Sequence, residues 1–74
     1  MSIVPMLRAA EITRRLLTAG FKIVKQRGSH VKLWHPITKH RTSVPFHGGK
    51  DIGRGLLASI IKQAGLTVEQ FLGL

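Results

Sequence analysis

The sequence predicts an α+β fold with the element order α-β-β-β-α-α, built on a three-stranded antiparallel sheet with helices on one face. Helical periodicity near both ends of the chain and alternation between them indicate this order. Short connections favour strands that follow one another as an antiparallel meander. With 74 residues, the chain is long enough for one thin core, so we expect residues 1–74 to form a single domain.

The first helix is predicted over residues 6–19. Apolar residues recur at helical spacing at Ala9, Ile12 and Leu16, and charged residues occupy the opposite arc. Gly20 is suited to end this helix in a left-handed conformation.

Two strands, residues 21–27 and 30–35, follow the helix and are joined by a tight turn at Gly28 and Ser29. The second strand alternates, so Val31 and Leu33 are expected to face the core. Its other face, which we expect to be open, carries His30, Lys32 and Trp34.

The third strand is predicted over residues 41–46, after a turn at residues 36–40, and Pro45 marks its end or an edge. Residues 47–51 form a loop in which Asp51 is expected to cap the next helix.

The second helix is closed by Gly65, and a capping box at residues 67–70 opens a short last helix with Phe71 and Leu72. The second helix is expected to bury Leu56, Leu57, Ile60, Ile61 and Ala64.

Charge is the strongest functional signal. Twelve Lys and Arg residues stand against three acids, and the net charge of +9 indicates a polyanionic or acidic partner. The basic residues are spread along the chain, which favours a binding face over a disordered tail. A basic helix on a membrane surface is the alternative, but the helices have apolar stripes of core-packing width. No apolar run is long enough to span a membrane, and no signal peptide is evident, so we expect a cytoplasmic protein.

The composition excludes several kinds of chemistry. Without cysteine the chain has no disulfides, thiolate zinc site or Cys nucleophile. Three scattered acids cannot form a two-metal nuclease site, and no phosphate-binding loop is present. We therefore expect no metal and no cofactor. Histidines and cations remain, and this set can cleave RNA because the 2′-hydroxyl supplies the nucleophile.

His30 is the leading catalytic candidate because it follows the Gly28-Ser29 turn and lies on the open face. An exposed strand histidine without a role is the alternative. His47 is the candidate for a second group, since it lies between a strand and a helix start, where backbone amides attract phosphate. His35 and His40 flank a turn and are expected to contact phosphate or to have no role.

The RNA-binding surface is expected to combine one aromatic side chain with several cations. Trp34 could stack on a base, or could equally be a core or partner-facing residue. The predicted RNA-binding residues are Lys32, Trp34, Arg41, Lys50 and Arg54.

Four stretches of the sequence together form a longer motif: Gly20-Phe21, Arg27-Gly28-Ser29-His30, Val44-Pro45-Phe46-His47 and the run from Gly55 to Gly65. In this order they resemble the HicA toxin family of bacterial toxin–antitoxin systems, over nearly the whole chain. The resemblance implies a double-stranded-RNA-binding-domain-like fold and a small mRNA endonuclease inhibited by a HicB antitoxin. It also implies that His30 is catalytic, while the role of His47 is our own inference. The turn at residues 36–40 departs from the Asp-Gly type of many relatives, and residues 1–5 match nothing.

The main hypothesis is thus a metal-independent endoribonuclease, the toxin of a toxin–antitoxin pair, monomeric on its own and bound by a HicB-like antitoxin. A non-catalytic double-stranded-RNA-binding module shares the charge and the element order but does not need His30. A third hypothesis is a structural protein, such as a ribosome-associated protein, for which the positive charge alone would suffice.

Overall fold

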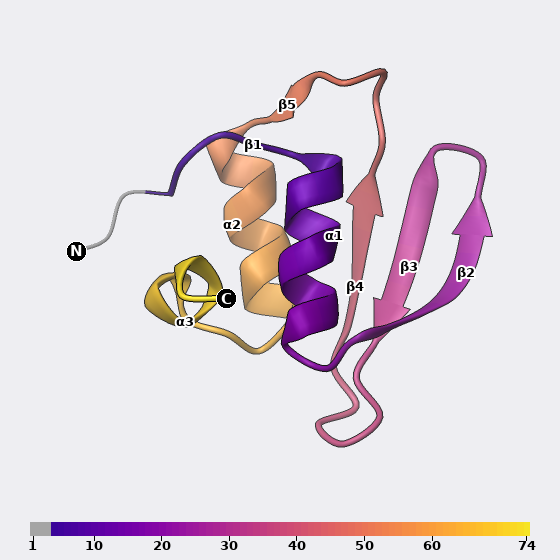
Figure 1. Ribbon diagram of the computed structural model, residues 1–74, viewed down its shortest axis with the longest axis vertical. Coiled ribbons are helices and arrows are strands. Elements are labelled where there is room, and N and C mark those ends of the chain that lie inside the picture. The colour runs from indigo at the N-terminus through magenta and orange to yellow at the C-terminus, as the bar shows by residue number, and fades with distance from the viewer. Residues whose placement is uncertain (1–3) are drawn as a thin grey trace.

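The computed structural model describes residues 4–74, and the predicted α+β class with a three-stranded antiparallel sheet is confirmed (Figure 1). Residues 1–3, which the predicted domain and the unmatched N-terminal stretch include, lie outside the described residues. The elements are β1 (Leu7–Arg8), α1 (Ala9–Thr18), β2 (Lys22–Arg27), β3 (His30–Trp34), β4 (Arg41–Pro45), β5 (Asp51–Ile52), α2 (Arg54–Gln63) and α3 (Val68–Leu72).

The main sheet has the strand order β2-β3-β4, with both pairs antiparallel. A two-residue turn joins β2 to β3, and Gly28 adopts the positive φ of 58° that such a turn requires. A bulge between Ile23 and Lys25 interrupts the first ladder. Gly28-Ser29 is therefore the predicted tight turn, and it places His30 at the start of β3.

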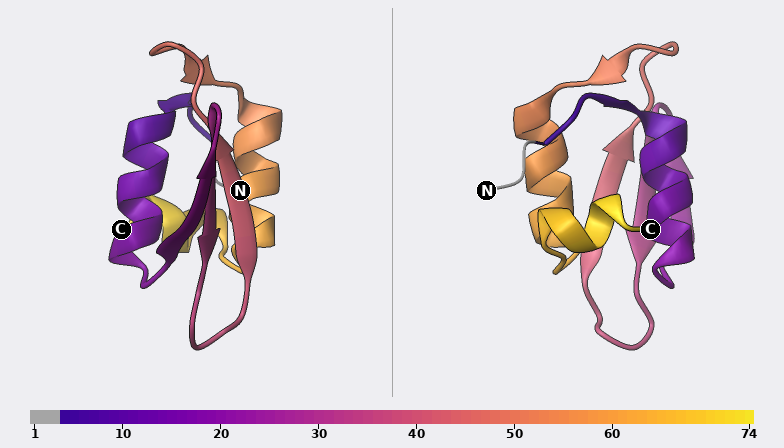
Figure 2. Two further views of the ribbon diagram at one scale, coloured as in Figure 1. Left: turned by 90° about the vertical axis from the view of Figure 1, so that its right-hand side faces the viewer. Right: turned by 60° about the vertical axis from the view of Figure 1, so that its left-hand side comes forward.

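One side of β3 and β4 faces the core. Val31, Leu33 and Val44 are buried there in a cluster with apolar residues of all three helices, and Thr42 of β4 is buried as well. In the right-hand view of Figure 2, the helices lie in front and β4 is seen between α1 and α2. The predicted layer of helices thus covers β3 and β4. All six residues of β2 are exposed, so this strand projects beyond the helices.

A second, two-stranded sheet was missed in the sequence. β1 and β5 pair antiparallel, with Leu7 opposite Ile52 and Arg8 opposite Asp51. The first helix consequently begins at Ala9 and not at residue 6, because the preceding residues are extended. A pairing of two-residue strands so far apart in the chain leaves no periodic signal.

The prediction that Asp51 caps the second helix was wrong. Asp51 lies in β5, and its carboxylate Oδ1 is 3.8 Å from Nε of Arg8. The N-cap of α2 is Gly53, which makes no side-chain capping bond. Because Asp51 and Ile52 pair with β1, the chain is still extended at these residues, and α2 begins only at Arg54.

The predicted core face of α2 is correct except at one position. Leu57, Ile60, Ile61 and Ala64 are buried, whereas Leu56 is 48% exposed. The four buried residues form one stripe, and Leu56 lies about 90° away from its centre at 100° per residue.

The β3–β4 turn lies at the same end of the molecule as the C-termini of α1 and α2 (Figure 1). His35 Nε2 donates to the carbonyl oxygen of Ala19 (3.1 Å), and its Nδ1 accepts from the backbone N–H groups of Ile37 and Thr38 (3.2 Å each). The ring also packs edge-on against Phe21, with centroids 5.1 Å apart. His35 therefore has a structural role instead of the phosphate contact considered from the sequence.

The last helix opens with the predicted capping box, in which Thr67 and Gln70 exchange hydrogen bonds. Arg15 joins this helix to α1, because its Nη1 donates to the carbonyl oxygen of Leu72 (2.8 Å) and its Nε donates to Glu11 (2.7 Å). Hydrogen bonds from Arg14 and Arg15 lower the pKa of Glu11 from 4.5 to about 2.

Candidate active site and nucleic-acid interface

The structure brings His30 and His47 together. Their ring centroids are 6.3 Å apart, with the planes at 88°. His30 lies opposite Pro45 in the ladder, and the N–H of Phe46 donates to the carbonyl oxygen of Ser29, which extends the pairing past the strand end. His47 thereby becomes the diagonal neighbour of His30 on the open face.

Both imidazoles border one hollow of about 340 Å³ between the ends of β3 and β4 and the outer side of α2. One phosphodiester in this hollow can face both rings, which is the arrangement that a general acid and a general base require. The hollow is lined by His30, Ser43, Pro45, His47, Leu56, Ser59, Ile60 and Gln63.

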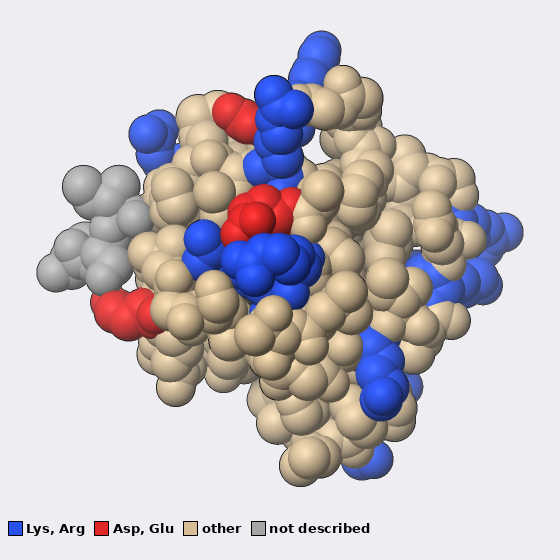
Figure 3. Space-filling view, in the orientation of Figure 1, with Lys and Arg blue, Asp and Glu red and all other residues tan. Residues whose placement is uncertain are grey.

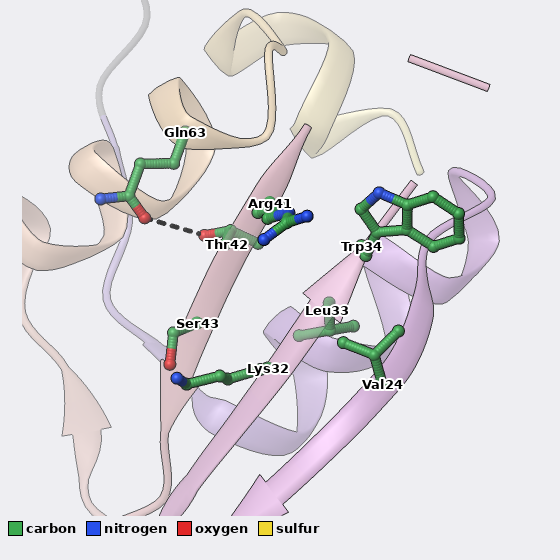
Figure 4. A pocket seen from close by; sticks show the side chains of 8 residues that line it. All are labelled: Val24, Lys32, Leu33, Trp34, Arg41, Thr42, Ser43 and Gln63. Atoms are coloured by element: carbon green, nitrogen blue, oxygen red, sulfur yellow. Dashed lines mark hydrogen bonds between the residues drawn. The ribbon is translucent and has the colours of Figure 1, made fainter. Parts of the chain in front are cut away.

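A larger hollow of about 490 Å³ continues along the open face of the sheet (Figure 4). It shares Ser43 and Gln63 with the histidine hollow, so the two hollows adjoin, and we call the pair the groove. Three of the predicted RNA-binding residues border it, namely Lys32, Trp34 and Arg41. Across the ladder, Arg41 is opposite Trp34 and Ser43 is opposite Lys32, which places all of them on the same face.

The positive charge is unevenly compensated. The ion pairs between described residues involve Arg8, Arg14 and Arg15, which contact Asp51 or Glu11 near the N-terminal elements. Figure 3 shows acidic and basic side chains together in the middle of the view, over α1, and further basic groups at the margins. Within residues 4–74, no ion pair engages the basic residues from β2 onward, which are Lys22, Lys25, Arg27, Lys32, Lys39, Arg41, Lys50, Arg54 and Lys62.

Two predicted RNA-binding residues lie outside the groove. Lys50 and Arg54 are exposed but border neither hollow. Arg54 opens α2, whose first turn holds no acidic residue and no capping side chain. These two cations add to the exposed positive charge but form the wall of neither hollow.

The sequence did not reveal that α2 contributes to the site. Leu56, Ser59 and Gln63 border the groove because α2 packs alongside the edge strand β4. Ser43 could have been found from the alternation of β4, since it shares a face with Arg41. The helix residues carry no comparable signal, because the way a helix packs on a sheet is not visible in a local pattern.

The described residues also bear on metals and membranes. Across residues 4–74, no group of three or more His, Asp or Glu side chains is arranged to hold a metal ion. No helix in this part of the chain is both long and apolar enough to cross a membrane.

Comparison with known proteins shows the family of the chain. Residues 9–66 match the family described as HicA toxin of bacterial toxin–antitoxin. The chain is 37% identical to a probable mRNA interferase HicA of Pseudomonas fluorescens (strain Pf0-1) over 60 residues. These aligned residues cover 81% of this chain and 97% of that protein. The matched region contains both hollows.

Proposed function

Because this chain belongs to the HicA toxin family, we propose that it is an endoribonuclease that cleaves mRNA, the toxin of a toxin–antitoxin pair. The observation that carries the proposal is the meeting of His30 and His47 at one hollow on a positively charged face. A relative that covers most of the chain is named an mRNA interferase, which supports the same activity.

The proposed reaction needs only these two imidazoles and the RNA itself. One imidazole of the pair takes the proton of a 2′-hydroxyl, and the 2′-oxygen then attacks the adjacent phosphorus. The bond from phosphorus to the 5′-oxygen breaks, and the second imidazole protonates that oxygen. The products are a 2′,3′-cyclic phosphate and a 5′-hydroxyl end, so no water or metal enters this step.

The cations of the groove supply electrostatic stabilisation. Lys32 and Arg41 are exposed beside the hollows and have no ion pair among the described residues. They are free to hold phosphates and to stabilise the charge that develops on the phosphorane. Both acids with described ion pairs, Glu11 and Asp51, are engaged by arginines away from the groove, which supports a mechanism without metal.

The proposal extends to partners and context. A HicB-like antitoxin would neutralise the toxin, which by itself would be a monomer in the cytoplasm, where mRNA is found. The order α-β-β-β-α and the antiparallel meander support a double-stranded-RNA-binding-domain-like fold, with residues 1–74 as one domain.

Incubation of purified protein with labelled mRNA in EDTA tests the function. We expect cleavage by the wild type and loss of about 10²–10⁴-fold in rate for His30→Ala, the usual contribution of a general acid or base. Circular dichroism should show an unchanged fold, because His30 is exposed. Full activity of His30→Ala, or a strict need for magnesium, would contradict the proposal. A pure RNA-binding module would shift the RNA without cutting it.

A further inference from the structure

The larger hollow has a wall that differs in chemistry from a phosphate site. Val24 and Trp34 contribute apolar surface, and Figure 4 shows them on one side with Gln63 across from them. Val24 is 57% exposed, so this apolar surface is open to solvent and is not filled by the protein itself. A mainly apolar hollow with a few polar groups is typical of a site for a flat organic ligand.

A cation contacts the tryptophan ring from outside the hollow. Nζ of Lys39 lies 5.0 Å from the ring centroid, and Lys39 does not border the hollow. A cation at this distance attracts the electron-rich ring face. This contact favours an orientation of the ring in which Trp34 also borders the hollow.

The opposite wall offers hydrogen-bond donors. The hydroxyl of Thr42 lies 3.3 Å from both the carbonyl oxygen of Ile60 and Oε1 of Gln63. This contact holds Oε1 of Gln63 towards Thr42, and the amide nitrogen of Gln63 points to the side away from Val24 and Trp34 (Figure 4). Ser43 and Arg41 border the same hollow, and their O–H and N–H groups can donate to the acceptor atoms that line the edges of nucleobases.

The position of the hollow relative to the histidines indicates which ligand it takes. His30, Lys32 and Trp34 alternate along the open face of β3, so His30 and Trp34 are roughly 13 Å apart at 3.3 Å per residue. Lys32 lies between them and can bind a phosphate. A strand whose phosphate lies at the histidine pair therefore reaches Trp34 with a neighbouring nucleotide.

From these observations we propose that the larger hollow binds an unpaired nucleobase of the RNA, stacked on Trp34, next to the cleavage point. This rests on the proposed function only in that the same strand runs past His30. Paired RNA in an A-form helix keeps its bases stacked and its base edges poorly accessible, so the site selects single-stranded segments. The base held here contributes to the choice of cleavage position.

Trp34 is the only tryptophan of a chain without tyrosine, so its fluorescence reports on this hollow. Wild-type protein would be titrated with 2′-O-methyl tetranucleotides, which bind but lack the nucleophile for cleavage. Oligomers of the same length without bases serve as the matched control, because they keep the phosphates. We expect quenching by the tetranucleotides and not by the abasic oligomers.

Variants locate the effect. Trp34→Ala should weaken binding of a fluorescein-labelled tetranucleotide by about fivefold to a hundredfold, the usual effect of removing an aromatic that stacks on a base. Val24→Glu tests the hollow with Trp34 kept in place, and Ile23→Glu is its control, because both positions are exposed β2 residues but only Val24 borders the hollow. Val24→Glu should suppress the quenching more than Ile23→Glu.

Equal quenching by abasic oligomers would overturn the nucleobase site, and so would the lack of quenching by any oligomer. The second result would indicate that the hollow binds a side chain of a partner protein. Equal effects of the two glutamate variants would overturn it as well. The outcomes are independent of the proposed reaction. Quenching without cleavage of ordinary RNA would retain the base site and reject the endoribonuclease, and cleavage without base-dependent quenching would do the reverse.

Discussion

The two ends of the β3–β4 hairpin carry two histidines each, and the two pairs differ in how their rings are bound. At one end, His30 and His47 are exposed, face each other and make no side-chain hydrogen bond among the described residues. At the other end, the ring of His35 has hydrogen bonds at both nitrogens. His40 packs its ring against Gly65. An imidazole with free nitrogens can transfer protons, whereas one with satisfied nitrogens holds the fold together.

The sharpest test of this difference is to replace one histidine from each end. His35→Ala should lower the free energy of unfolding by about 3 kcal/mol, because three backbone groups lose hydrogen bonds worth about 1 kcal/mol each. His30→Ala should change it by no more than about 0.5 kcal/mol, as for most surface substitutions. Urea unfolding monitored by circular dichroism measures both.

The rate of RNA cleavage should rank the two histidine variants in the opposite order. At a temperature where both variants are folded, His35→Ala should cut RNA at the wild-type rate and His30→Ala should not. If His35→Ala loses cleavage while its stability is unchanged, the assignment of the two ends is wrong.

The glycines at the two ends extend the comparison. Gly20 has φ of 105°, and an added Cβ would lie 2.7 Å from Nε2 of His35. Gly28 has φ of 58°, and a Cβ there would meet nothing within 4 Å. We expect Gly20→Ala to cost about 2–3 kcal/mol, from backbone strain and a ring fixed by its hydrogen bonds, and Gly28→Ala about 1 kcal/mol.

Thermal unfolding of the two glycine variants is the measurement. Combining Gly20→Ala with His35→Ala should recover part of the loss, because the contact with the ring is then absent. If Gly20→Ala and Gly28→Ala lowered the free energy of unfolding equally, the ring of His35 would not be in close contact with Gly20 at the end of α1.

A third region is the ion-paired surface of α1 around Glu11, which contains no histidine and which Arg15 connects to α3. Its contribution to stability should depend on pH in a range of its own. The pKa of Glu11 is lowered from 4.5 to about 2 by hydrogen bonds from Arg14 and Arg15. A carboxylate with a lowered pKa stabilises the fold above pH 4.5, and this contribution is lost as the pH falls towards 2. The effect is the smallest of the three, since these side chains are partly exposed to solvent.

Glu11→Gln should therefore lower the urea midpoint slightly at pH 7 and leave it unchanged near pH 2. RNA cleavage at pH 7 should be the same as that of the wild type. A stability difference that persists at pH 2 would show that Glu11 acts through packing and not through its charge.

Local patterns explain what could be predicted. Alternation in β3 placed His30, Lys32 and Trp34 on the open face, and the glycine at position 28 indicated the turn before His30. The core residues of α2 followed from their spacing, apart from Leu56. Asp51 was misassigned because its partner strand lies more than forty residues earlier in the chain.

The sequence by itself determined the α+β class, the positive charge, the small number of acids and the choice of His30 as candidate, because composition and short periodic patterns encode these properties. Only the tertiary structure decided that His47 faces His30, that Gln63 joins the groove and that His35 belongs to the fold and not to the site. These facts depend on the register between β3 and β4 and on the packing of helices against strands. Contacts of that kind join distant residues through shape, and no local pattern records them.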